Sequence, residues 1–122
     1  MKKLSGRASG HYSPGVIAGG MLYVSGQLPR IPETGNIAAG GIEAQAQQAL
    51  LNLEAVLKLG GATRENVVQC RVYVTDIGLW DAVNGVYSAF FGGHKPARAI
   101  VPVGALHHGC LIEIEAVAEL PQ

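Results

Sequence analysis

Apolar residues recur every third or fourth position from Ile42 onward, which is the spacing of one face of an α-helix. Polar residues such as Glu43, Gln47 and Lys58 fall largely between them, and Gly60-Gly61 marks the stop. The pattern predicts an amphipathic helix with one covered face. The residues of that face are Ala46, Ala49, Leu50, Leu53, Val56 and Leu57.

A second helix is indicated after Asp76, whose side chain can cap a helix N-terminus. The helix is predicted to end at Gly92-Gly93, before Pro96. Its apolar stripe includes Trp80, Tyr87, Phe90 and Phe91, and we interpret these aromatic residues as core that packs between helix and sheet. The stripe consists of Leu79, Trp80, Val83, Val86, Tyr87, Phe90 and Phe91.

Strands are indicated by alternation of apolar and polar residues. Residues 16–18 and 21–25 form a predicted hairpin, because the intervening Gly19-Gly20 can adopt the positive φ angles of a two-residue turn. Val68, Cys70, Val72 and Val74 alternate with polar residues in a third strand, and residues 29–41 read as a loop. Two final strands are predicted at residues 97–103 and 111–120.

The predicted order ββ-α-β-α-ββ indicates an α+β fold in one domain, residues 1–122, with both helices on one face of a mixed sheet. In the last strand Glu113 and Glu115 lie on the face opposite Ile112 and Ile114. We therefore expect charged residues on the uncovered face. Arg98 shares its side of a strand with Ile100, and we expect both to share that uncovered face with Glu113.

The composition argues against nucleic-acid-binding and membrane proteins. Nine Lys and Arg balance nine Asp and Glu, so the cationic excess that nucleic-acid binding normally demands is missing. No apolar stretch approaches membrane-spanning length, and no apolar segment of a signal peptide follows Met1-Lys2-Lys3. We expect a soluble, cytoplasmic protein that binds neither nucleic acid nor membrane. Cys70 and Cys110 are predicted to be buried free thiols, and neither a disulfide nor a metal site is expected.

The residues alone leave the candidate chemistry open. Arg98, near the start of an otherwise apolar strand, can grip a carboxylate with its fork of donors, or it can be an ordinary solvent-exposed arginine. Glu113 and Glu115 can act as a general acid and base, but any strand with one solvent-exposed face shows the same pattern. His107-His108 is interpreted as a polar turn. Ser25-Gly26-Gln27 can offer backbone donors to an anion or simply end a strand.

The functional interpretation of these residues is favoured by seven groups of motifs, which occur in order along nearly the whole chain from Tyr12 to Glu119. Together they resemble the reactive-intermediate deaminase (RidA, or YjgF/L-PSP) family. They are Gly10-His11-Tyr12 with residues 21–27, Pro32-Glu33-Thr34-Gly35, Ile42-Glu43-Ala44-Gln45, Asn66-Val67-Val68, Val83-Asn84-Gly85-Val86-Tyr87 with Phe90-Phe91, Pro96-Ala97-Arg98, and Ile112-Glu113-Ile114-Glu115-Ala116.

The resemblance implies a chorismate-mutase-like fold and a homotrimer whose sheets surround a central axis, with three clefts between subunits. It implies hydrolysis of 2-imino acids, of the 2-iminobutanoate and 2-iminopropanoate type, to 2-keto acids and ammonia without a cofactor. Arg98 would hold the substrate carboxylate and Glu113 would position or activate water. Tyr12, Ser25, Gly26 and Ile100 would line the cleft, Gly26 through its backbone, and Ile100 stands where many deaminases of the family have cysteine.

Two other functions stay open at this point. The chain can be a trimer that binds a small carboxylate such as a keto acid without catalysis, or, with less support from its neutral charge, an endoribonuclease.

Overall fold

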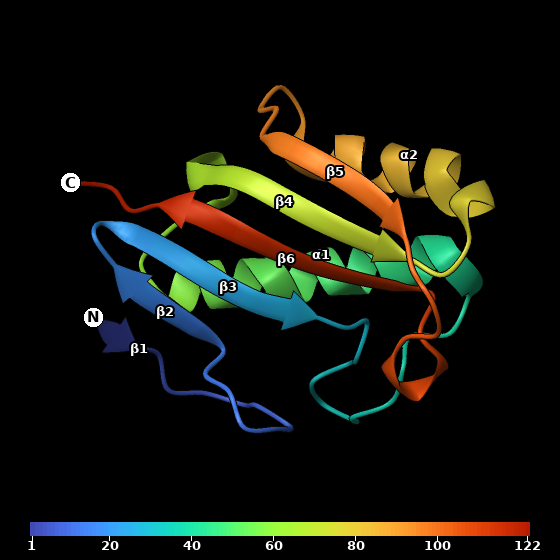
Figure 1. Cartoon of the computed structure of the whole chain (residues 1–122), viewed down its shortest axis with the longest axis horizontal. Coiled ribbons are helices and arrows are strands. Elements are labelled where there is room, and N and C mark those ends of the chain that lie inside the picture. The colour runs from blue at the N-terminus through green and yellow to red at the C-terminus, as the bar shows by residue number, and fades with distance from the viewer.

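A computed structural model describes all residues, 1–122, and contains one six-stranded sheet with two helices (Figure 1). The α+β fold with a mixed sheet is confirmed. The strands are β1 (Lys2–Lys3), β2 (Gly15–Ala18), β3 (Met21–Gln27), β4 (Val67–Val74), β5 (Ala97–Pro102) and β6 (Ile112–Glu119), and the helices are α1 (Gly41–Leu59) and α2 (Trp80–Phe91). Three short 3₁₀ turns span Arg64–Asn66, Ile77–Leu79 and His107–Gly109.

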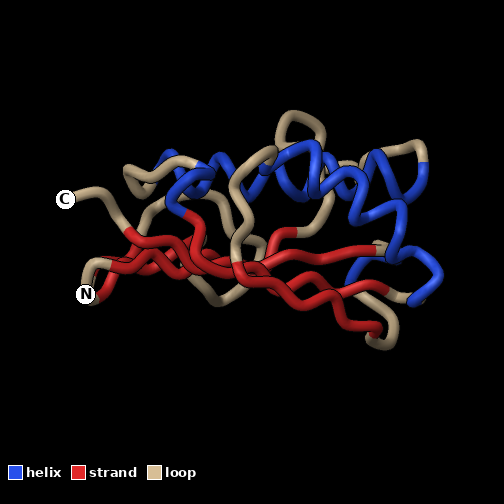
Figure 2. Tube along the Cα trace, turned by 90° about the horizontal axis from the view of Figure 1, so that it is seen from above, coloured by secondary structure: helices blue, strands red, loops and turns tan.

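The strand order across the sheet is β1-β2-β3-β6-β4-β5. Only β4 and β5 pair in parallel, and every other pair is antiparallel. Both helices lie on the same face of the sheet, as the sequence predicted (Figure 2). We call this the helix face and the other the open face. The strand β5 is an edge strand, and its neighbour β4 supplies its only pairing.

The hairpin between β2 and β3 forms as expected. Gly19 and Gly20 have φ angles of 58° and 77°, a conformation that only glycine adopts at little cost. The additional strand β1 was not predicted, since Lys2 and Lys3 carry no apolar signal and pair with β2 through backbone groups.

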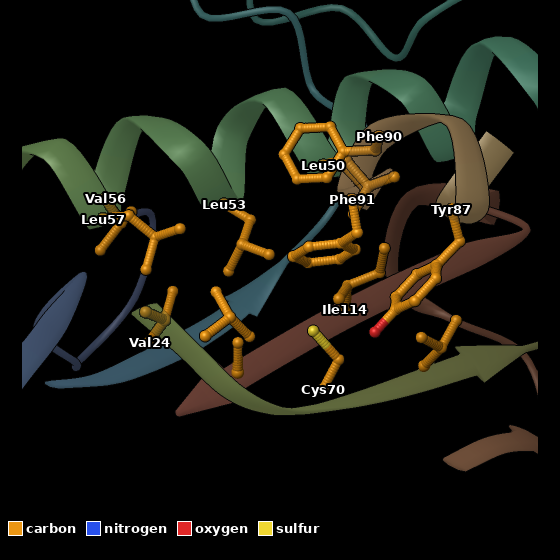
Figure 3. Packing of buried hydrophobic residues seen from close by; sticks show 14 of the residues in the cluster. Val24, Leu50, Leu53, Val56, Leu57, Cys70, Tyr87, Phe90, Phe91 and Ile114 are labelled. Atoms are coloured by element: carbon orange, nitrogen blue, oxygen red, sulfur yellow. The ribbon is translucent and has the colours of Figure 1, made fainter. Parts of the chain in front are cut away.

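The core lies between the helix face and the two helices (Figure 3). All six residues of the predicted face of α1 are buried, among them Leu50 and Leu53. Ile112, Ile114, Ala116 and Ala118 of β6 are buried beneath them. The Gln45 Oε1 atom accepts a hydrogen bond of 2.8 Å from the Leu111 backbone N–H, which ties the start of α1 to the approach of β6.

Two details of α2 differ from the prediction. Trp80 is 36% exposed and lies outside the core cluster, because it is the first residue of α2. Asp76 caps the preceding 3₁₀ turn, by accepting a 2.7 Å hydrogen bond from the Gly78 N–H, and the helix begins four residues later. Tyr87, Phe90 and Phe91 are buried as predicted.

Cys70 and Cys110 are both free and buried, as expected. Neither helix has the length and hydrophobicity that a bilayer crossing requires.

Candidate active site

Arg98 lies on the helix face at the exposed edge of the sheet. The register pairs Arg98 with Cys70, and paired residues of parallel strands point to the same face. Its guanidinium donates a hydrogen bond of 2.8 Å to Asn84 Oδ1 of α2. The Cζ atom lies 4.8 Å from the centre of the Tyr87 ring and 5.4 Å from that of Trp80. Arg98 is half-buried and forms no ion pair, so its other N–H donors can bind a carboxylate.

Behind Arg98 lie two buried groups that cannot supply the chemistry. Burial raises the pKa of the Cys70 thiol to about 11, so Cys70 is protonated at neutral pH and is not a nucleophile. The Tyr87 hydroxyl is buried without a hydrogen-bond partner, and it points toward Cys70 (Figure 3). Burial and the neighbouring Cys70 raise the pKa of Tyr87 as well. Of these three side chains, Arg98 is therefore the one that is charged at neutral pH and able to bind an anion.

Glu113 lies on the open face, on the opposite side of the sheet from Arg98. Its neighbours along β6, Ile112 and Ile114, are buried on the helix face, and successive residues of a strand alternate. The Glu113 carboxylate lies against Gly26 of β3, since a Cβ atom added to Gly26 would come within 2.1 Å of Oε2. Burial, followed by the nearby charge of Glu115, raises the pKa of Glu113 above its ordinary value. A raised pKa suits a carboxylate that exchanges protons near neutrality.

The two acidic residues of the open face differ in their partners. Glu115 accepts a 2.5 Å hydrogen bond from the Tyr73 hydroxyl and lies 3.6 Å from an Arg71 nitrogen. Glu113 takes part in no hydrogen bond and no ion pair of the chain. The structure thus leaves the Glu113 carboxylate free while Glu115 is held by its neighbours.

Ser25, Gly26 and Tyr12 surround the same end of β3. Ser25 Oγ donates a 2.6 Å hydrogen bond to the Ser13 carbonyl, so the segment that carries Tyr12 is attached to the strand. The pairing of β3 with β6 shifts between Val24 and Gln27, an irregularity that re-aims the backbone at Ser25 and Gly26. Tyr12 is 49% exposed. These three residues and Glu113 form one half of the predicted site.

The expectation that Arg98, Ile100 and Glu113 share one sheet face is wrong. Arg98 and Ile100 lie on the helix face, where Ile100 packs against the core, and Glu113 lies on the open face. The chain therefore carries the candidate residues in two separate groups, which we call the Arg98 half-site and the Glu113 half-site. The Arg98 half comprises Arg98, Ile100, Asn84, Trp80 and Tyr87, and the Glu113 half comprises Glu113, Gly26, Ser25 and Tyr12.

Sequence reasoning missed two neighbours of Arg98. Asn84 accepts the guanidinium hydrogen bond, although it was visible only as part of the Val83-Asn84-Gly85 motif. Trp80 was assigned to the core. A polar residue on the apolar side of α2, one turn from Tyr87, was the available signal for Asn84.

A cavity of about 420 Å³ adjoins the Glu113 half-site. We call it the α1 cavity, because α1 forms one wall, while the N-terminal segment and the loop after β3 form the others. Tyr12 and Gly26 line it. Its further lining is Gly6, Arg7, Ala8, Ser9, Pro14, Gln27, Leu28, Arg30, Pro32, Gly35, Asn52, Ala55, Val56 and Leu59.

His107 and His108 form a turn, as interpreted from the sequence. Their rings stack with centroids 3.7 Å apart, and His108 adopts a positive φ of 60°. No group of three or more His, Cys, Asp or Glu side chains in the chain is arranged to hold a metal ion.

The fold and these residues define a member of one family. The family model described as "Endoribonuclease L-PSP" matches residues 3–120, and the chain belongs to this RidA (YjgF/L-PSP) family, as the motifs indicated. The 2-iminobutanoate/2-iminopropanoate deaminase of Rattus norvegicus is 43% identical over 111 residues, which cover 91% of this chain and 81% of that protein. The human deaminase of the same name is 41% identical, with the same coverage.

Solved structures of family members have the same fold as this chain. RidA from an Antarctic Psychrobacter has a TM-score of 0.93 at 34% identity, and the match covers 98% of this chain and 100% of that one. The structure of E. coli TdcF with bound serine gives a TM-score of 0.93 at 33% identity, covering 99% and 100%.

Proposed function

We propose that this protein hydrolyses 2-imino acids to 2-keto acids and ammonia in clefts between the subunits of a homotrimer. The observation that carries the proposal is the division of the candidate residues. Arg98 and Glu113 point to opposite faces of the sheet, and each is free of ion pairs. A site that uses both groups needs Arg98 from one subunit and Glu113 from the next.

Features of β5 support such an assembly. It is an edge strand whose Ala97, Ala99 and Val101 are exposed, Val101 by 40%. Exposed edges and apolar strand faces are normally covered in native proteins. Contact with another subunit would cover β5 and bring a Glu113 half-site toward Arg98. The deaminase names of the relatives at 41–43% identity support the reaction itself.

In the proposed cleft the Arg98 guanidinium holds the substrate carboxylate bidentately, and Asn84 and the two aromatic rings orient the guanidinium. Glu113 accepts a proton from water as the water oxygen bonds to the imine carbon, and the C=N electron pair moves to nitrogen, which takes that proton back from Glu113. In the resulting carbinolamine the hydroxyl proton passes through Glu113 to the amino nitrogen, the C–N bond breaks, ammonia leaves and the hydroxyl oxygen becomes the keto oxygen. Atoms balance with one water consumed and no oxidant, and binding in the right orientation supplies much of the acceleration.

Complementation tests the shared cleft. Arg98→Ala and Glu113→Ala, each expected to lose turnover about 30-fold or more, are mixed in equal amounts, unfolded and refolded together. In a trimer with shared clefts, about one quarter of the clefts combine an intact Arg98 with an intact Glu113, so about one quarter of the wild-type activity returns. Ammonia release from an imine made in situ by an amino-acid oxidase is the readout. No recovery in well-mixed trimers, or a monomer by light scattering, would overturn the shared cleft.

Arg98→Lys tests whether Arg98 acts through bidentate hydrogen bonds to the substrate carboxylate or only through its positive charge. Lysine keeps the positive charge but not the planar fork, so the variant is expected to be badly impaired while it remains trimeric. Lys58→Ala, which removes an exposed charge from α1, is the control and should keep wild-type turnover. If wild-type protein binds keto acids yet does not exceed the spontaneous rate of imine hydrolysis, the protein is a carboxylate-binding trimer and the deaminase proposal is wrong.

A further inference from the structure

Three residues on one face of α2 contact the Arg98 guanidinium. Trp80, Asn84 and Tyr87 are spaced four and three residues apart, so they lie on the same side of the helix. Asn84 accepts the guanidinium hydrogen bond, and the centres of the Trp80 and Tyr87 rings lie 5.4 and 4.8 Å from Cζ. A carboxylate that Arg98 binds is therefore bordered by this face of α2.

Trp80 is the residue of this face that keeps apolar surface available to a ligand. Tyr87 is buried, and its hydroxyl points toward Cys70 (Figure 3). Asn84 is half-buried, and its side-chain oxygen already accepts a hydrogen bond from Arg98. Trp80, in contrast, is 36% exposed and lies outside the core cluster. Its indole therefore offers an apolar contact beside the carboxylate-binding guanidinium.

Ile77 extends this exposed apolar surface. It is 57% exposed and begins the 3₁₀ turn that precedes α2. The Trp80 backbone N–H donates to the Ile77 carbonyl, and side chains three residues apart in such a turn lie nearly over each other. The acidic residue before them, Asp76, accepts its hydrogen bond from the Gly78 N–H. The surface next to Arg98 thus suits an apolar chain better than a charged one.

We propose that Trp80 determines substrate specificity, because its exposed indole binds the side chain of the 2-imino acid and favours uncharged, longer aliphatic chains. This assignment rests on the proposed function and specifies its substrate class. Arg98 binds the carboxylate that all 2-imino acids share, and the side chain begins two bonds from that carboxylate carbon, within reach of the residues around the guanidinium. Each further methylene adds contact with Trp80 and then with Ile77.

A homologous series of keto acids tests the inference. Calorimetric titration of the wild-type protein compares pyruvate, 2-oxobutanoate, 2-oxopentanoate and 2-oxohexanoate, which differ by one methylene at each step. We expect the affinity to rise about 2-fold per methylene, because a methylene covered on one side gains about half the transfer free energy of a fully buried one. 2-Oxoglutarate has the chain length of 2-oxopentanoate but a second carboxylate, and it should bind more weakly.

Variants at position 80 identify the residue responsible. Trp80→Ala should remove the dependence on chain length. Affinity for all the keto acids also falls because the ring no longer packs against Arg98, so the readout is the ratio between successive acids. Trp80→Phe keeps a smaller ring and should show an intermediate dependence, which also provides the test if Trp80→Ala does not fold. Leu51→Ala removes a comparably exposed apolar residue of α1, outside both half-sites, and should keep the wild-type dependence.

Tryptophan fluorescence reports the contact directly, because Trp80 is the only tryptophan of the chain. A ligand that covers the indole removes water from it, so the emission should shift to shorter wavelength. The shift should be larger with 2-oxohexanoate than with pyruvate, each at saturation.

Equal affinities along the series in wild type, tighter binding of 2-oxoglutarate than of 2-oxopentanoate, or a chain-length dependence that survives in Trp80→Ala would overturn this assignment while the proposed function stands. The same holds if 2-oxohexanoate binds without changing the emission, or if Leu51→Ala loses the dependence as well. Failure of the wild-type protein to bind any of these keto acids would overturn the proposed function together with this inference.

Discussion

Gly26→Ala tests whether the position of the Glu113 carboxylate matters. The new Cβ would lie 2.1 Å from Glu113 Oε2, and ordinary contact begins at 3.4 Å, so the carboxylate must move by about 1.3 Å. Gly26 is not among the residues with positive φ, and alanine therefore fits its backbone. Glu113 is at the end of a flexible side chain, so we expect the free energy of unfolding to change by less than about 1 kcal/mol.

Turnover should respond far more than stability. A displacement of about 1 Å in a positioned catalytic group can cost about 100-fold in rate, and we expect Gly26→Ala to lower kcat by about 10- to 100-fold. The assay is ammonia release from an imine made in situ, with thermal unfolding followed by circular dichroism. Gly85→Ala is the matched control. Its Cβ would meet no atom within 4 Å, so it should keep turnover and stabilise α2 by about 0.5–1 kcal/mol.

A double-mutant cycle shows whether the effect passes through Glu113. In a Glu113→Ala background the obstructing carboxylate is absent, so adding Gly26→Ala should change turnover little. A folded Gly26→Ala trimer with wild-type turnover would refute the reasoning. An equal loss in both backgrounds would show that the alanine acts on the substrate rather than on Glu113.

Three further predictions concern titratable groups. The pKa of Glu113 is raised in the folded state, so the protonated carboxyl stabilises the fold at low pH, and this contribution is lost as pH rises through the ordinary pKa and the folded pKa. Glu113→Gln should therefore raise Tm at pH 7 but not below a pH of about 4, and it should lower turnover. An unchanged Tm at pH 7 would contradict this. Tyr87→Phe removes a buried hydroxyl without a partner and should leave Tm equal or higher; a clear loss of stability would reveal a partner for the hydroxyl. Because the pKa of Cys70 is about 11, iodoacetamide at pH 8 should modify Cys70 only after unfolding, as mass spectrometry can establish, and rapid labelling of the native protein would show a reactive thiolate.

Periodicity was enough to predict both helices, the strands other than β1, and the buried faces of α1 and β6. The six apolar residues of the predicted face of α1 are all buried, because a helix against a sheet must bury one continuous stripe. The alternation of β6 assigned Ile112 and Ile114 inward and Glu113 outward for the same reason. In α1 and β6 one face is apolar and the other polar, so the local sequence pattern alone predicts which face is buried.

The side of the sheet on which Arg98 lies was decided only by tertiary structure. Alternation groups Arg98 with Ile100, but β5 has apolar residues on both faces, among them Val101, so the sequence gives no sign of which face is covered. The parallel register with β4, which pairs Arg98 with Cys70, settles it. Trp80 follows the helical stripe, yet it begins α2 and stays partly exposed.

The α1 cavity likewise could not be predicted from the sequence. Arg7 and Arg30 lie in segments without periodicity, and hydrogen bonds to Pro32 and from Asn52, distant in sequence, bring them to one wall. The sequence by itself determined both helices, most of the strands and the family, since these depend on local pattern and motif. The tertiary structure decided which face Arg98 occupies and where Arg7 and Arg30 lie, because strand register and long-range hydrogen bonds have no local signature.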